Sequence, residues 1–379
     1  MPTVSTSRVL LAIVAIAPCL VLLAPVAIIV LPLLAIAASA RAIGRALEAR
    51  HVPWSDLMQF DPQLGWKPRP QLDARYLAEG DDVFHVETDA DGWPGRRTIA
   101  ESDVVAIGDS FAFGYGVHTA QSFAAQSTAC RVKAIGAPGY SMVHGVLLME
   151  QLAEQLRGKL IVWLVYLEND LQDNLAPEMR QYRAPFVRRA SDGWHIEDRH
   201  LSSRPWRCSD LDRRRLFARF CVPGPLAERA FSAADYLIGR AQAVCGRAGA
   251  RLVIVTVPHA TQLTPAGQRE LAAASGDPAK CDAGLPDAEL ARSCQRHQVQ
   301  MVAGREHLRA ADYKQREGIH WTVRGHRRMA AIIATLAAES PRTDAAGQPG
   351  RRSGSVPDVV HRAASPAPLA TGPSRSATT

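Results

Sequence analysis

An apolar run that ends in Gly-Asp-Ser is the first place where the residue types of this sequence could do chemistry. Residues 104–107 read Val-Val-Ala-Ile, and Gly108, Asp109 and Ser110 follow directly. In open α/β sheets ligands bind beyond the carboxyl ends of the strands, so a serine there is placed to act as a nucleophile. The backbone N–H of Ser110 can face the negative charge that develops on a substrate oxygen. The alternative interpretation is an ordinary turn without chemistry.

A serine nucleophile needs a base, and the sequence offers one near its end. Glu317-Gly318-Ile319-His320 precedes a tryptophan and then a helical pattern. Histidine suits proton transfer near neutral pH, and a carboxylate three residues earlier can orient its ring. The chain has 12 histidines, so an unrelated Glu and His are the alternative. We predict that Ser110, His320 and Glu317 form the catalytic set.

Two further segments could stabilise an oxyanion. The glycine-rich turn 136–141 follows one predicted strand, and Gly139 within it could offer a backbone N–H. Asn169 follows another predicted strand, and its side-chain amide could donate as well. A tight turn and a strand-end cap are the alternatives for these two residues. With the Ser110 N–H, they make the predicted oxyanion hole.

Alternating strands and helices must position these residues. Such alternation predicts a parallel sheet covered on both faces, with the strand ends gathered at one edge. We expect strands at 104–107, 131–135, 160–167 and 251–257, and helices at 121–130, 142–157, 227–248 and 325–338.

These blocks resemble the SGNH hydrolase superfamily over roughly residues 100–340. The resemblance implies a flavodoxin-like three-layer sandwich that hydrolyses or transfers O-acyl groups, with acetyl as the expected group. It carries the nucleophile onto Ser110, the oxyanion glycine onto Gly139, the amide donor onto Asn169 and the base onto His320. Apart from the resemblance, the sequence has no Cys-x-x-Cys pair, and His320 and His326 are six residues apart, which does not suit one helical face, so we expect no metal site and no cofactor.

The sequence departs from the family pattern at three positions. Glu317 stands where the family has Asp, Leu167 replaces a glycine, and Ala134 replaces an asparagine. Upstream, 61–66 and 91–95 resemble a region of bacterial membrane-anchored SGNH proteins, which often act on envelope carbohydrate.

Hydrophobicity and composition divide the 379 residues into five predicted segments. After the flank 1–8, residues 9–40 carry no charge, and about 20 apolar residues suffice to cross a bilayer. We therefore expect a transmembrane segment at 9–40, although a cleaved signal or a hairpin are alternatives. Residues 41–100 read as a linker with a small loop-and-strand segment, 101–340 as the hydrolase-like domain, and 341–379 as a disordered tail. Within the domain, 171–225 reads as an insertion or lid.

Two features of the sequence favour opposite sides of the membrane for the catalytic domain. Arginines after the apolar run favour a cytoplasmic domain by the positive-inside rule. Cysteines favour the opposite side, because Cys208/Cys221 and Cys281/Cys294 share one spacing and disulfides need an oxidising compartment. Free buried thiols are the alternative. We expect an inner-membrane protein with a periplasmic catalytic domain.

The charged residues of the sequence indicate which classes of molecule this protein could bind. Segment 178–219 holds eleven arginines against six acidic residues, which fits either a basic lid for an anionic glycan or a solvated surface. Nucleic acid is a poor match, because aromatics do not interleave with the basic residues. An ester-bearing small molecule or glycan is the expected substrate, with a membrane protein of polysaccharide synthesis as a possible partner. A catalytically silent, membrane-tethered binding or scaffold protein is the competing function.

Overall fold

The computed structural model describes residues 30–37, 39, 57–77, 83–176, 178–179, 182–202, 213–315 and 319–339. Of the predicted membrane span 9–40, most residues lie outside this part, and 30–37 are helical. Among the described residues, no helix combines the length and apolar character that crossing a bilayer requires. The predicted tail 341–379 and the segment 40–56 also lie outside the described residues.

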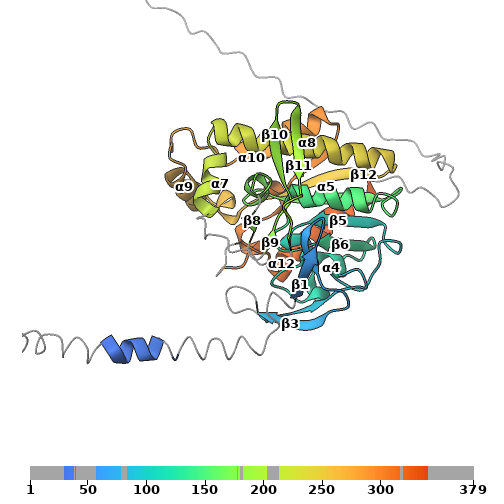
Figure 1. Ribbon diagram of the computed structural model, residues 1–379, viewed down its shortest axis with the longest axis horizontal. Helices are drawn as coiled ribbons and strands as arrows, with labels where there is room; N and C mark the ends of the chain where they lie inside the picture. Colours follow the sequence, from blue (N-terminus) through green and yellow to red (C-terminus); the bar gives the residue numbers. More distant parts are fainter. Residues whose placement is uncertain are drawn as a thin grey trace, which may run out of the picture. The chain divides into compact units, whose positions relative to one another are not determined.

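A five-stranded parallel sheet forms the centre of the region 101–340 (Figure 1). Across the sheet the strands lie in the order β6-β5-β7-β12-β13. Numbered by their order in the chain, this is 2-1-3-4-5, the flavodoxin-like order. The predicted parallel α/β sheet is therefore confirmed. Its strands are β5 (Val104–Gly108), β6 (Val132–Gly136), β7 (Leu160–Tyr166), β12 (Arg251–Val257) and β13 (Gln300–Ala303).

Side chains of the sheet pack into two separate cores, one on each face. Val105 and Ile107 point into the core beneath α5 (Met142–Gln151), α8 (Pro225–Arg247) and α10 (Leu285–Arg296). Val104 and Ala106 point into the opposite core, together with residues of α3 (Ser110–Phe113), α4 (Phe123–Gln126) and α12 (Val323–Ala338). Every residue of β5 is buried, as expected for a strand covered on both faces. The molecule thus has the expected three layers.

Several elements differ from the prediction. The helix expected at 121–130 is the short α4, because Ser122 caps it at one end and it stops before the strand at Val132. The edge strand β13 was not predicted, since an edge position leaves its short Gln-Met-Val-Ala sequence only partly buried. The helix α10 was missed as well. The other elements are η1 (Thr119–Gln121), η2 (Ala260–Leu263), α9 (Pro265–Ala274), α11 (Gly304–His307) and η3 (Ala310–Asp312).

Two hairpins precede the sheet and join its core. They are β1 (Met58–Asp61) with β2 (Gly65–Pro68), and β3 (Asp73–Leu77) with β4 (Val83–Glu87). Trp66 and Phe84 pack into the same core as Val105.

Lys133 on β6 ties the segment after these hairpins to the sheet. Its amine is 2.7 Å from an Asp89 carboxylate oxygen and donates to the carbonyls of Pro94 and Gly95 at 3.1 and 3.2 Å. Burial lowers the pKa of Lys133, and the nearby Asp89 carboxylate opposes this shift. Because the amine is almost fully buried, these partners are needed to offset its desolvation.

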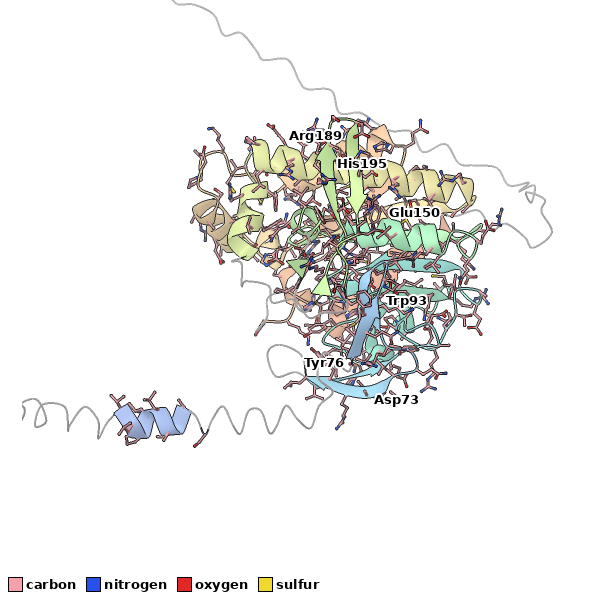
Figure 2. All side chains as sticks on the ribbon, in the orientation of Figure 1. Asp73, Tyr76, Trp93, Glu150, Arg189 and His195 are labelled. Atoms are coloured by element: carbon pink, nitrogen blue, oxygen red, sulfur yellow. The ribbon has the colours of Figure 1, made fainter. Side chains whose placement is uncertain are left out.

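The region 171–225 has regular structure where it is described. The hairpin β10 (Phe186–Ala190) and β11 (Gly193–Glu197) lies against α8, since Trp194 donates its indole N–H to Ser232 at 3.0 Å. Arg189 and His195, labelled in Figure 2, come from its two strands. The region also contains α6 (Asp170–Asp173), β8 (Glu178–Met179), β9 (Tyr182–Arg183) and α7 (Arg213–Phe220).

The cysteines do not follow the pairing that their spacing suggested. Cys294 is buried on α10, whereas the Cys281 thiol is within hydrogen-bonding reach of the Cys221 thiol. The Asp282 N–H also donates to the Cys221 carbonyl at 2.8 Å. Cys281 and Cys294 both have free thiols in the structure, in agreement with the alternative of free thiols. Cys208 lies outside the described residues.

Candidate active site

Ser110 and His320 meet at the carboxyl end of β5. The Ser110 Oγ is 3.0 Å from the His320 Nε2, and the two residues are 8% and 9% exposed. Ser110 is the first residue of α3, whose N-cap is Asp109; the Asp109 carboxylate accepts from the Phe111 N–H at 3.0 Å. This cap fixes the serine at the start of a helix, directly after the strand. The distance allows proton transfer from the hydroxyl to the imidazole.

Local contacts hold the backbone and ring of His320. The Lys314 N–H donates to the His320 carbonyl at 2.8 Å, and the neighbouring Trp321 pairs with Tyr313 in an isolated β-bridge. The ring of Tyr115 lies 4.5 Å from the imidazole, centroid to centroid. Packing against Tyr115 thus limits the movement of the imidazole, and the backbone bonds hold the segment that carries it. Glu317, the predicted acid, lies outside the described residues, so its role stays a prediction.

The glycine-rich turn 136–141 lies directly beside the Gly-Asp-Ser segment that follows β5. Gly136 at the end of β6 pairs with Gly108 at the end of β5. A Cβ on Gly136 would lie 2.4 Å from the Gly108 carbonyl oxygen and 2.9 Å from that of Asp109. Only glycine allows this approach, so the turn that contains Gly139 is held next to the turn that contains Ser110.

The predicted oxyanion residues are both buried at this edge of the sheet. Gly139 has a φ of +85°, a left-handed conformation that favours glycine. Asn169, 6% exposed, follows β7, and its side chain is close enough to the Asp109 carboxyl to oppose the rise in the pKa of that group. The structure therefore brings Asn169 next to the residue that precedes Ser110.

A group of buried carboxylates that the sequence analysis did not identify lies beneath Asn169. Asp109, Asp170 and Asp173 are all at least 95% buried. Burial raises the pKa of Asp109 to about 7, and the Asp173 charge acts in the same direction. Burial, followed by the Asp109 charge, also raises the pKa of Asp170 well above its usual value. Their positions after two strands were the only signal in the sequence.

Asp312 is a second functional candidate that the sequence analysis missed. It is fully buried, and its carboxylate oxygens lie 2.9 Å from Arg324 Nε and 2.7 Å from Arg328 Nε on α12. Its carbonyl accepts from the backbone N–H and the hydroxyl of Thr322 at 2.8 and 3.0 Å. Asp312 therefore closes the loop that carries His320. The local sequence does not mark it, because its side-chain partners Arg324 and Arg328 lie more than ten residues away on α12.

Two other sites contain a histidine, and these residues, His259 and His85, are not part of the predicted catalytic set. His259 at the end of β12 caps η2, and its Nδ1 is 2.6 Å from the Thr261 hydroxyl. Within the described residues, Asp73, His85 and Glu87 bring three ligand-type atoms within 4.8 Å of one another on the β3–β4 hairpin. The Arg96 guanidinium already lies 3.1 Å from Glu87 and 3.4 Å from Asp73, so a cationic group neutralises this cluster.

Comparisons with known proteins give structural likenesses only. No family model matches the sequence, and no curated protein matches it. A GDSL-like lipase from Bacteroides thetaiotaomicron is 12% identical, covers 65% of this chain and 92% of its own, and gives a TM-score of 0.34. A carbohydrate acetylesterase family member from Sinorhizobium meliloti is 13% identical. The match covers 62% of this chain and 96% of that protein, with a TM-score of 0.35.

An extracellular lipase from Streptomyces rimosus is 14% identical, with 62% and 99% covered and a TM-score of 0.34. Identities and TM-scores of this size transfer no activity to the present chain. Its strand order, with Gly-Asp-Ser at the end of the first strand of the sheet, is the flavodoxin-like order of an open parallel α/β sheet.

Proposed function

We propose that this protein is a serine-dependent enzyme of the SGNH type that hydrolyses or transfers O-acyl esters. The observation that supports this most directly is the 3.0 Å contact between Ser110 Oγ and His320 Nε2 in a buried setting. A hydroxyl is a weak nucleophile by itself, and a histidine within hydrogen-bond reach activates it. The buried glycine turn and amide beside it supply candidate donors for the oxyanion.

In the proposed reaction His320 takes the proton of Ser110 while the serine oxygen attacks the ester carbonyl. The N–H groups of Ser110 and Gly139 and the amide of Asn169 stabilise the negative oxygen of the tetrahedral intermediate. His320 then passes its proton to the leaving alcohol, which gives an acyl-enzyme. Glu317 orients the imidazole in this scheme. Water or a sugar hydroxyl, deprotonated by His320, releases the acyl group and restores the serine.

The finer parts of the proposal concern substrate and place. We propose an acetyl ester on envelope carbohydrate, with residues 9–40 anchoring the chain in the inner membrane and the catalytic domain in the periplasm. The upstream segments 61–66 and 91–95 and the apolar run support this choice. A membrane protein of polysaccharide synthesis would supply the acyl donor if the enzyme is a transferase.

Labelling with a fluorophosphonate probe tests the enzyme proposal, because such probes react with activated serines. We expect the wild type to be labelled and to hydrolyse p-nitrophenyl acetate, and Ser110→Ala to do neither. Ser127→Ala is the matched control, since the Ser127 hydroxyl lies away from the site and binds Cys130, 3.0 Å from its carbonyl and 3.4 Å from its thiol. Unlabelled wild type would reject the enzyme and favour a binding or scaffold protein. Adding an oligosaccharide acceptor then separates transfer from hydrolysis.

A further inference from the structure

The hairpin before the sheet is bonded to the peptide that carries the proposed oxyanion donor. Trp66 on β2 is 1% exposed, and its indole N–H donates to the Pro138 carbonyl at 3.1 Å. That carbonyl belongs to the peptide unit whose N–H is the N–H of Gly139. A trans peptide is planar, so its C=O and N–H point in opposite directions. The bond from Trp66 therefore fixes where the Gly139 N–H points.

The conformation of this turn makes such a bond consequential. Tyr140 N–H donates to the Ala137 carbonyl at 3.1 Å, and Gly139 has a φ of +85°. Proline followed by a glycine of positive φ at the centre of a four-residue turn is the pattern of a type II turn. Types I and II differ by a flip of the central peptide, here the peptide from Pro138 to Gly139. A flip would remove the carbonyl from the Trp66 indole and reverse the Gly139 N–H.

Tyr140 ties the other side of Gly139 to the same tryptophan. Its hydroxyl donates to the Trp66 carbonyl at 2.6 Å, and its ring lies 5.6 Å from the indole. Burial raises the pKa of Tyr140 well above its usual value, so the hydroxyl keeps the proton that it donates. Trp66 thus binds both neighbours of Gly139, one as donor and one as acceptor.

His144 adds a third connection between the hairpin and the turn. Burial lowers the pKa of His144 to about 3, so the ring is neutral. Its Nδ1 accepts from the Ser141 N–H at 3.0 Å, which places the ring hydrogen on Nε2. Nε2 then donates to the Leu64 carbonyl at 3.1 Å. The turn is consequently held at both ends by the segment Leu64–Trp66.

We propose that Trp66 is a positioning residue for the reaction: it selects the peptide orientation that directs the Gly139 N–H towards the oxyanion. This rests on the proposed function, because Gly139 acts as a donor only in that scheme. It makes the β1–β2 hairpin, which lies outside the sheet, part of the catalytic unit. The hairpin would then be required for the acylation step as well as for folding.

Trp66→Phe tests the proposal, since it keeps an aromatic ring and removes the N–H. Loss of one oxyanion donor costs about 10²- to 10³-fold in kcat, and a misdirected donor should cost at least about 10-fold. We expect kcat for p-nitrophenyl acetate to fall by that factor with little change in KM. Benzeneboronic acid, whose serine adduct is tetrahedral, should bind the variant correspondingly more weakly. Labelling with the fluorophosphonate probe should be slower but reach the same final extent.

Ser102→Ala is the matched control, because it removes a partly buried bond of 2.8 Å from the Ser102 hydroxyl to the Thr98 carbonyl, just before β5 begins. It should leave kcat and boronate affinity unchanged. If Trp66→Phe is too unstable, Tyr140→Phe removes the second bond to Trp66 and should give a smaller fall in kcat. Wild-type kcat and boronate affinity in Trp66→Phe would overturn the proposal.

Hydrogen exchange separates this proposal from the proposed function. The peptide 137–141 should exchange faster in Trp66→Phe than in wild type or in Ser102→Ala, whatever the activity. If the wild type is not labelled by the probe, the enzyme proposal fails while exchange still reports on the turn. If exchange is unchanged in Trp66→Phe, the tryptophan does not hold the turn and the inference fails, even with an active enzyme.

Discussion

The hydroxyl of Ser110 lies 3.0 Å from the imidazole of His320, although 210 residues separate them in the chain. The serine follows β5, and the histidine precedes α12, which packs on the same side of the sheet as α3. Parallel strands place the loops that follow them along one edge, so this meeting results from the topology of the sheet.

Replacing the histidine should remove most of the activity. For His320→Gln we expect kcat for p-nitrophenyl acetate to fall about 10³-fold or more, because the serine loses its general base. Steady-state kinetics and probe labelling measure this loss. His307→Gln, at an exposed position, is the control and should behave as wild type. Equal activity in the two variants would remove His320 from the mechanism.

Removing the buried carboxylate behind the His320 loop should lower stability and activity together. Asp312→Ala leaves two arginines and the Arg309 N–H without their acceptor, and we expect a loss of about 2–3 kcal/mol in the free energy of unfolding. The loop then loosens, so kcat should fall as well. Urea unfolding at pH 7 gives the stability change.

The matched control for this variant is Asp103→Ala. Its partner Arg131 lies 2.7 Å away, but both side chains are about half exposed, and such pairs contribute less than about 1 kcal/mol. If Asp103→Ala lost as much free energy of unfolding as Asp312→Ala, burial of the carboxylate would not explain the large effect expected for Asp312.

Asp109 should make the protein less stable as pH rises. Burial raises the pKa of Asp109 from 3.8 to about 7, so the folded state keeps a proton that the unfolded chain releases above about pH 4. Its contribution to stability is therefore full below pH 4 and is lost as the pH rises to about 7. Asp109→Asn has no such titration and can still accept from the Phe111 N–H as an N-cap.

We therefore expect Asp109→Asn to gain stability relative to wild type between pH 5 and pH 8. Urea unfolding of both proteins at the two pH values measures the difference. Burial raises the pKa of Asp170 in both proteins, but the part of that shift that comes from the Asp109 charge is lost in Asp109→Asn, so the measured difference includes the coupling between the two carboxyls. A constant difference between the two proteins would show that Asp109 does not hold its proton.

Oxidation should join Cys221 to Cys281. The two thiols are near enough to influence each other's pKa, and the Asp282 N–H donates to the Cys221 carbonyl at 2.8 Å. Diamide takes the two thiol hydrogens, the two sulfurs form one bond, and diamide becomes its hydrazine. Burial raises the pKa of both thiols, so the reaction should be slow at pH 7 and faster at pH 9.

Peptide mass spectrometry identifies the crosslink, and Cys221→Ser should abolish it. A crosslink between Cys281 and Cys294 would contradict the arrangement, because Cys294 is buried on a helix.

The sequence by itself determined the order of elements and the residues at the strand ends. Apolar runs such as 104–107 and 160–167 predict buried parallel strands, and Gly-Asp-Ser and the glycine turn follow two of the strands that form. These features are local, because a strand's burial and a turn's glycine leave their mark within a few residues.

Only the tertiary structure decided which distant groups meet. The bond from Trp66 to Pro138 spans 72 residues, and the ion pair from Lys133 to Asp89 joins a strand to a loop that no periodicity connects with it. Burial, which sets the pKa of Asp109, likewise depends on every element packed around it. Such contacts are fixed by packing of the whole chain, and for that reason the sequence showed the hairpin that binds Pro138 and Tyr140 only as a motif, without its contacts.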